Sequence, residues 1–121
     1  MEGKTTLVLG ASLNPERYSN MAIKRLRKFG HKVLAIGLKS GRVGDVDIQT
    51  GLPEFPPVNT VTLYLSPKNQ HQYYDYILSL KPERIIFNPG AENDELARLA
   101  DKNNIESLEA CTLVMLSTNQ F

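Results

Sequence analysis

Residues 5–15 read TTLVLGASLNP, and the class of fold follows from these eleven letters. Residues 5–9 are aliphatic or β-branched, so apolar side chains point to both sides of an extended chain. This pattern is typical of a strand that is covered by helices on both faces. The triplet 10–12, Gly-Ala-Ser, ends the strand, and the loop 13–19 leads into a helix. A buried strand, a glycine turn and a helix in this order indicate a doubly wound α/β fold.

Strand-like and helix-like segments alternate along the rest of the chain. Further strands are predicted at residues 32–36, 60–65, 84–87 and 107–110, with a short one at 46–48 in a glycine- and proline-rich stretch. Residues 112–116 are predicted to be an apolar tail. Right-handed crossovers leave few other topologies for such alternation. We therefore predict a Rossmann-like α/β fold, a doubly wound, mostly parallel five-stranded sheet with helices on both faces, in a single domain over residues 1–121.

Three predicted helices carry clear local signals. Apolar residues form one stripe along residues 22–29, and Gly30 ends that helix. Ser66 is predicted to cap the free amides of a second helix, with Pro67 at its first position, where no amide is needed. Residues 93–95, Asn-Asp-Glu, open a third helix, whose acids complement the positive end of its dipole.

Composition excludes several classes of partner and site. The chain has 14 basic and 13 acidic residues, a net charge of +1, so we expect neither a nucleic-acid partner nor a membrane partner. Cys111 is the only cysteine, which excludes an intramolecular disulfide and a cysteine-based metal cluster. The first apolar run is too short for a secretory signal or a membrane span. These features predict a cytoplasmic protein without a metal site.

The triplet Gly10-Ala11-Ser12 occupies the position of a phosphate loop. A tight turn without side-chain bulk can present the free amides of the next helix to a diphosphate. The strict fingerprint G-x-G-x-x-G is absent, however. An ordinary strand-to-helix turn is therefore an equally good interpretation of this glycine alone.

Gly-Ala-Ser-x-Asn-Pro at 10–15, after an N-terminal strand, resembles the stand-alone CoA-binding domain family. That family is similar to the N-terminal CoA-binding domain of the succinyl-CoA synthetase α subunit. The resemblance covers essentially the whole chain, and it includes residues 30–33, 51–53, 92–100 and Cys111. It implies that coenzyme A is the ligand.

The resemblance also implies a set of binding residues. Gly10, Ala11 and Ser12 match the loop that holds the CoA diphosphate, and Tyr18 and Ser19 match the helix entry beside it. Lys39 matches a basic position near the adenosine phosphate. The other matching positions are the turn beside the adenine and pantetheine and the fourth-strand loop: Leu65, Ser66, Pro67 and Gly90.

The end of the second strand gives a separate indication of the ligand. Enzymes that use NAD carry an acidic residue there, which binds the ribose hydroxyls. Residues 37–42 read GLKSGR and contain no acid. Ammonium and guanidinium groups pair with phosphate, so this loop suits the phosphorylated ribose of CoA or of NADP. A solvated loop with two basic residues is the alternative.

No combination of residues predicts catalysis. The synthetase uses a phosphorylated histidine of a second domain, and here His31 and His71 are both expected to be structural or exposed. No base–nucleophile pair or H-E-x-x-H motif is present. Cys111 is interpreted as a small core residue, with a mixed disulfide to CoA as a hypothesis.

The favoured hypothesis is a non-catalytic sensor, carrier or partner module that binds CoA or an acyl-CoA. An NADP-binding redox or sensor protein and an interaction module without a ligand are the alternatives. The sequence does not decide between a monomer, a homo-oligomer and a complex with a protein partner.

Overall fold

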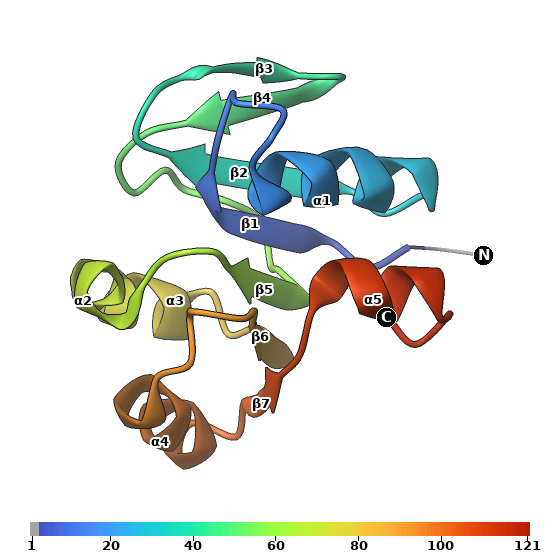
Figure 1. The fold of residues 1–121 in the computed structure, drawn as a ribbon. Helices are drawn as coiled ribbons and strands as arrows, with labels where there is room; N and C mark the ends of the chain where they lie inside the picture. The colour runs from blue at the N-terminus through green and yellow to red at the C-terminus, as the bar shows by residue number, and fades with distance from the viewer. Residues whose placement is uncertain (1–2) are drawn as a thin grey trace.

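Seven strands form one sheet in the computed structural model, which describes residues 3–121 (Figure 1). The strand order is β3-β4-β2-β1-β5-β6-β7. The strands are β1 (Thr6–Ala11), β2 (Val33–Gly37), β3 (Gly41–Val43), β4 (Val46–Gln49), β5 (Thr60–Leu63), β6 (Arg84–Phe87) and β7 (Glu106–Glu109). All neighbouring pairs are parallel except β3 and β4. The helices are α1 (Tyr18–Lys28), α2 (Pro67–Gln70), the 3-10 turn η1 (His71–Tyr73), α3 (Tyr74–Ser79), α4 (Asp94–Lys102) and α5 (Thr112–Ser117).

The predicted Rossmann-like, mostly parallel sheet is confirmed, but the predicted number of five strands is wrong. Of the two strands beyond the predicted five, β4 matches the short strand suggested at 46–48, whereas β3 was not predicted. They form a hairpin in which Val43 pairs with Val46 across Gly44 and Asp45. Gly44 has φ +60°, a conformation that a two-residue hairpin turn requires. The hairpin buries Val43, Val46 and Ile48 beside the edge of β2. A Gly-Asp pair between short apolar runs was the signal that could have predicted it.

Helices cover both faces of the sheet, as predicted. On one face, Ile23 of α1 and Leu116 of α5 pack against Val8 of β1. On the other face, Ile77 of α3 and Leu96 of α4 belong to a second core cluster. Figure 1 shows α1 and α5 on one side of the strands and α2, α3 and α4 on the other. Strands that are buried on both faces explain the continuous apolar runs in the sequence.

The predicted helix signals are confirmed in part. Asn93 caps α4 by accepting hydrogen bonds from the amides of Glu95 and Leu96, and Pro67 is the first residue of α2. Ser66 precedes α2, but its side chain accepts no bond from a backbone amide of that helix, so the predicted cap is wrong. The helix after it is broken into α2, η1 and α3. The predicted apolar tail is the helix α5.

Asn88 connects three elements at the carboxyl end of β6. Its side chain is 2% exposed. Its amide nitrogen donates to Oγ1 of Thr62 (2.7 Å) and to the carbonyl oxygen of Leu63 (2.8 Å), both on β5. Its oxygen accepts from the amide of Thr112 (2.9 Å), at the start of α5. The buried amide therefore holds α5 against two strands.

His31 has a structural role at the opposite end of the sheet, where its Nδ1 accepts a hydrogen bond from the amide of Lys4 (2.9 Å). Burial, followed by the nearby charges of Lys4 and Arg84, lowers the pKa of His31. A lowered pKa means that the unfolded chain binds more protons than the folded chain between the two pKa values. We expect the free energy of unfolding to decrease as the pH falls below about 6.5.

Urea unfolding at several pH values between about 8 and 5.5 measures this decrease. In a His31→Asn variant, the amide oxygen can accept the same bond and does not titrate. Its free energy of unfolding should depend less on pH than that of the wild type. Equal pH dependence in both proteins would contradict the assignment to His31.

Candidate functional site

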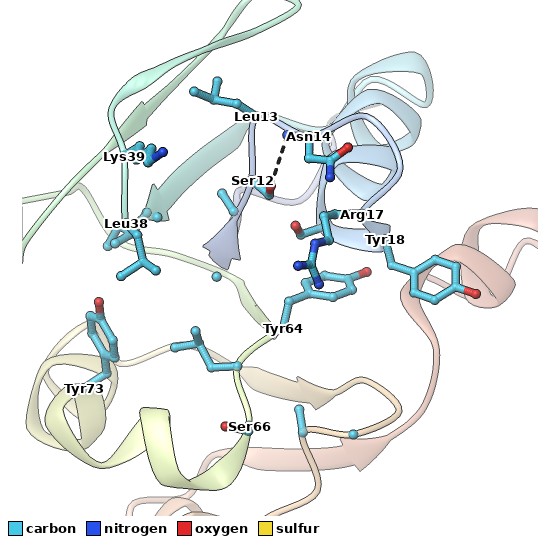
Figure 2. Close-up of a pocket in the computed structure, with 18 of the residues that line it drawn as sticks. Ser12, Leu13, Asn14, Arg17, Tyr18, Leu38, Lys39, Tyr64, Ser66 and Tyr73 are labelled. Carbon is cyan, nitrogen blue, oxygen red and sulfur yellow. Dashed lines mark hydrogen bonds between the residues drawn. The ribbon is translucent and has the colours of Figure 1, made fainter.

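A cavity of about 630 Å³ opens at the carboxyl ends of β1, β2, β5 and β6 (Figure 2). Its position agrees with the general rule that open α/β sheets bind ligands beyond the carboxyl ends of their strands. Its volume lies within the range of about 300–1,000 Å³ for small-molecule sites. All predicted site residues except Pro67 line it: Gly10, Ala11, Ser12, Tyr18, Ser19, Lys39, Leu65, Ser66 and Gly90.

Gly10 and Ala11 belong to β1 rather than to the turn that follows it, which corrects the predicted strand end at residue 9. The pairing of β1 with β2 shifts register between Leu9 and Ala11, so Gly10 forms an irregularity in the strand. Gly10 has φ +96°, and an added Cβ would lie 3.0 Å from the carbonyl carbon and oxygen of Tyr64. Glycine is therefore needed here both for its conformation and for its small size.

The turn itself starts at Ser12 and is held by side chains. Oγ of Ser12 accepts a hydrogen bond from the amide of Asn14 (3.1 Å), and Oδ1 of Asn14 accepts from the amide of Glu16 (3.0 Å). The buried side chain of Asn20 donates to the carbonyl oxygen of Ser12 (2.9 Å). These bonds direct the chain from the end of β1 into the amino end of α1.

The amino end of α1 faces the cavity. The helix begins at Tyr18, and its preceding residue Arg17 makes no side-chain cap. The first amides of a helix have no acceptor within it, and they carry the positive end of the helix dipole. The first turn of α1 contains no acidic residue. This end of the helix is therefore suited to an anion.

Two cations and no carboxylate line the cavity. Lys39 follows β2, and Arg17 lies across the cavity from it in Figure 2. Within residues 3–121, neither cation forms a salt bridge. The charged side chains of the lining are therefore all positive, although the whole chain is nearly neutral.

Sequence reasoning missed about half of the lining. Arg17 was detectable as a basic residue directly before the helix that follows the glycine turn. Tyr73 could not be found in this way, because it lies in η1, where a continuous helix was predicted. The remaining residues that were missed are Leu13, Asn14, Ile36, Gly37, Leu38, Tyr64, Pro89 and Ala91.

Gly37 and Tyr64 shape the cavity without offering charge. A Cβ at Gly37 would lie 2.3 Å from the carbonyl oxygen of Ala11, so only glycine allows the ends of β1 and β2 to approach this closely. Burial raises the pKa of the Tyr64 hydroxyl to about 12. Tyr64 is therefore neutral at physiological pH.

The histidines and the cysteine do not line the cavity. His71 contacts Glu95 (3.1 Å) and packs against the ring of Tyr74. Cys111 is half-buried and precedes α5. Within the described residues, no cluster of His, Cys, Asp and Glu could hold a metal ion, and no helix is long and apolar enough to cross a membrane.

Comparison with known families identifies the fold family. The family model for the CoA binding domain matches residues 4–117. The chain belongs to the CoA binding domain family. Membership in this family implies that this CoA binding domain has a small-molecule ligand. The volume and position of the cavity agree with this.

Solved structures agree with this assignment. The crystal structure of an uncharacterized protein is 47% identical to this CoA binding domain, with a TM-score of 0.96 and 100% of both chains covered. A conserved hypothetical protein from Pyrococcus furiosus is 25% identical (TM-score 0.78, covering 92% of this chain and 97% of its own). A protein from Thermus thermophilus is 21% identical (TM-score 0.86, 98% and 91%), which shows a common fold. The comparison with curated proteins found no match.

The residues of the cavity fit coenzyme A. Coenzyme A carries a diphosphate and a ribose phosphate, and the cavity offers the amino end of α1 with two cations that form no salt bridge within residues 3–121. A carboxylate that would repel these phosphates is absent from the lining.

Replacing Gly10 by alanine should destabilise this CoA binding domain. The substitution combines an unfavourable positive φ with a contact against the Tyr64 backbone. We expect a loss of about 2–4 kcal/mol in the free energy of unfolding, measured by urea denaturation.

Gly51→Ala is the matched control. Gly51 also has a positive φ, +74°, but nothing lies within 4 Å of an added Cβ. Its loss should be about 1 kcal/mol. Equal losses of unfolding free energy in the two variants would show that the contact with Tyr64 does not contribute to the destabilisation.

Proposed function

We propose that this protein binds coenzyme A or an acyl-CoA in the cavity and acts as a non-catalytic sensor, carrier or partner module. The observation that carries the proposal is the lining of the cavity. Two cations and the amino end of a helix face it, and no carboxylate does. Family membership favours CoA among the anionic nucleotides.

In this proposal the diphosphate binds beside the turn at Ser12 and the first amides of α1. The amides at a helix start have no acceptor within the helix, so they can donate hydrogen bonds to a bound anion. Arg17 precedes these amides in the chain and supplies a guanidinium that can pair with phosphate oxygens. The neutral side chains of Ser12 and Tyr18 add no repulsion.

Lys39 is assigned to the ribose phosphate. It follows β2, where an NAD-binding protein would carry an acid for the ribose hydroxyls. A lysine at this position disfavours NAD and suits a phosphorylated ribose. NADP also has such a phosphate, so the choice between CoA and NADP depends on the other contacts.

The experiment that tests the proposal compares CoA with dephospho-CoA by isothermal titration calorimetry. Wild-type protein should bind CoA more tightly, and Lys39→Ala should weaken CoA binding by about 10-fold, since a charged hydrogen bond contributes about 1.5 kcal/mol. Binding of dephospho-CoA should change little. Lys102→Ala, an exposed lysine of α4 outside the cavity, is the control.

Two further results would overturn the proposed ligand, and a third would overturn only the role of Lys39. Tight NADPH binding without CoA binding would favour the redox or sensor alternative. Failure to bind either nucleotide, together with no bound mass in native mass spectrometry, would favour an interaction module. An unchanged CoA preference in Lys39→Ala would remove Lys39 from the site.

A further inference from the structure

The outer surface of the helix layer formed by α1 and α5 is more apolar than that of the opposite layer. Seven large hydrophobic side chains are exposed among residues 3–121, and four of them belong to this layer. They are Tyr18 and Met21 of α1, Phe29 directly after it, and Val114 of α5. Among the described residues, α2, α3 and α4 expose none. Exposed apolar residues that gather on one face mark interaction surfaces more often than residues that are scattered singly.

Three elements follow one another across this side of the molecule. The helices α1 and α5 are in contact. α5 lies over the middle of the sheet, because Leu116 packs against Val8 of β1 and Thr112 hydrogen-bonds to Thr62 of β5 (2.8 Å). β7 is the edge strand beyond β6, and Figure 1 shows α5 between α1 and β7 on this side. The exposed Val114 of α5 is therefore at the centre of this α1–α5–β7 face.

One edge of the α1–α5–β7 face is cationic. Lys24, Arg25 and Lys28 are exposed on the later turns of α1, a helix that contains no acidic residue. Within residues 3–121, none of the three forms a salt bridge. Together with Met21 they line a surface groove of about 220 Å³. Cations without a partner in their own chain favour an acidic surface opposite them.

The other edge of the face is acidic. Register through β6 and β5 aligns Leu108 of β7 with Val8 of β1, which faces α1 and α5. Glu106 lies two positions before Leu108 and therefore points to the same side of the sheet. Glu106 and Glu83, which precedes β6, are both exposed, whereas the neighbouring Arg84 is 9% exposed. The two carboxylates are therefore the charges that this edge presents to solvent.

We propose that a second copy of this chain covers the α1–α5–β7 face in a symmetric dimer, whichever ligand the cavity binds. A two-fold axis parallel to the strands and beside α5 places α1 of each copy opposite β7 of the other. The cations of α1 then meet the acids of the other copy twice, once on each side of the axis. An axis across the strands would instead oppose the cations of the two α1 helices.

The positions of the charges along the strands agree with this arrangement. Lys28 is the last residue of α1, and the chain enters β2 only five residues later. Lys28 therefore lies toward the amino ends of the strands. Glu83 and Glu106 lie at the same end, because they stand before β6 and at the start of β7. Rotation about an axis parallel to the strands keeps this level, so the opposite charges meet.

The first test is sedimentation velocity of the full chain, which should show a dimer at about 10–100 µM. Val114→Asp should weaken self-association by about 100-fold, because it opposes two carboxylates at an apolar contact. Val114 is 56% exposed, so this variant should keep the wild-type circular dichroism spectrum. Leu52→Asp is the matched control. Leu52 is 57% exposed and lies outside α1, α5 and β7, so its variant should dimerise like the wild type.

The second test examines the symmetry with two charge-reversed proteins. The first carries Arg25→Glu and Lys28→Glu, and its own dimer would oppose acids to acids. The second carries Glu83→Lys and Glu106→Lys, and its own dimer would oppose cations to cations. Each protein alone should be monomeric at concentrations where the wild type dimerises. An equimolar mixture should recover the dimer, because opposite charges then meet on both sides of the axis.

Three results would overturn the proposal. A monomeric wild type would do so, and its cosedimentation with phosphatidylserine vesicles, lost with Arg25→Glu and Lys28→Glu, would assign the face to a membrane instead. A dimer that survives Val114→Asp would place the contact on another face. A mixture of the two charge-reversed proteins that stays monomeric, while both keep the wild-type circular dichroism spectrum, would exclude the two-fold arrangement.

Discussion

Ser12→Glu is expected to abolish coenzyme A binding while the protein stays folded. Ser12 lies at the turn between β1 and α1 and lines the cavity. A glutamate there would place a carboxylate against the diphosphate that we assign to this turn, and opposed like charges cost several kcal/mol. Calorimetry should show a loss of affinity of about 100-fold or more.

Two control variants separate charge from shape. Ser12→Gln introduces a neutral side chain of the same size and should weaken binding far less than the glutamate does. Ser107→Glu adds the same charge at an exposed position of β7, outside the cavity, and should leave affinity unchanged. The difference between the Glu and Gln variants at position 12 should shrink as salt is raised, because salt screens exposed charges. If Ser12→Glu retained wild-type affinity, the diphosphate could not lie at this turn.

Asn88→Leu is expected to cause the largest loss of stability. The substitution keeps a similar volume but removes the hydrogen bonds to Leu63, Thr62 and Thr112. The carbonyl oxygen of Leu63 and the amide of Thr112 then lose these bonds in a buried environment, and each unsatisfied group costs about 1–3 kcal/mol. We expect the free energy of unfolding to fall by about 3–5 kcal/mol in urea denaturation.

The exposed Asn103 provides the comparison for this substitution. Its side chain donates one hydrogen bond, to the carbonyl oxygen of Leu99 (2.8 Å), at the end of α4. Because water can replace this bond, Asn103→Leu should cost less than about 1 kcal/mol. A similar loss at both positions would mean that the network around Asn88 contributes little beyond packing.

The main strands and several helix boundaries could be predicted because their signals are local. The strand 84–87 was predicted with its observed ends, since residues 85–87 form an apolar run that is buried on both faces of the sheet. Asn93 and Pro67 were placed correctly because the chemistry of a helix start depends on a few neighbouring residues. The strand β4 was suggested at 46–48, but its hairpin partner β3 was missed because it is short and mostly exposed, which weakens an alternation pattern.

The candidate site was predictable as a set of loops but not as one cavity with its full lining. Ser12, Lys39 and Gly90 follow strands, and the carboxyl ends of parallel strands meet at one edge of a sheet. Arg17 and Tyr73 are separated by more than fifty positions in the sequence, and nothing in the local pattern places them at one cavity.

The sequence by itself determined that strands and helices alternate, that most of the sheet is parallel, and that a turn leads from the first strand into a helix. These properties depend on side-chain patterns over short segments, where burial and hydrogen bonding act between near neighbours. Only the tertiary structure decided that Gly10 lies inside β1 against Tyr64 and that Leu38 faces Tyr73. Such contacts depend on the strand order and on how closely neighbouring strands approach, and these are set by the packing of the whole sheet rather than by any one segment.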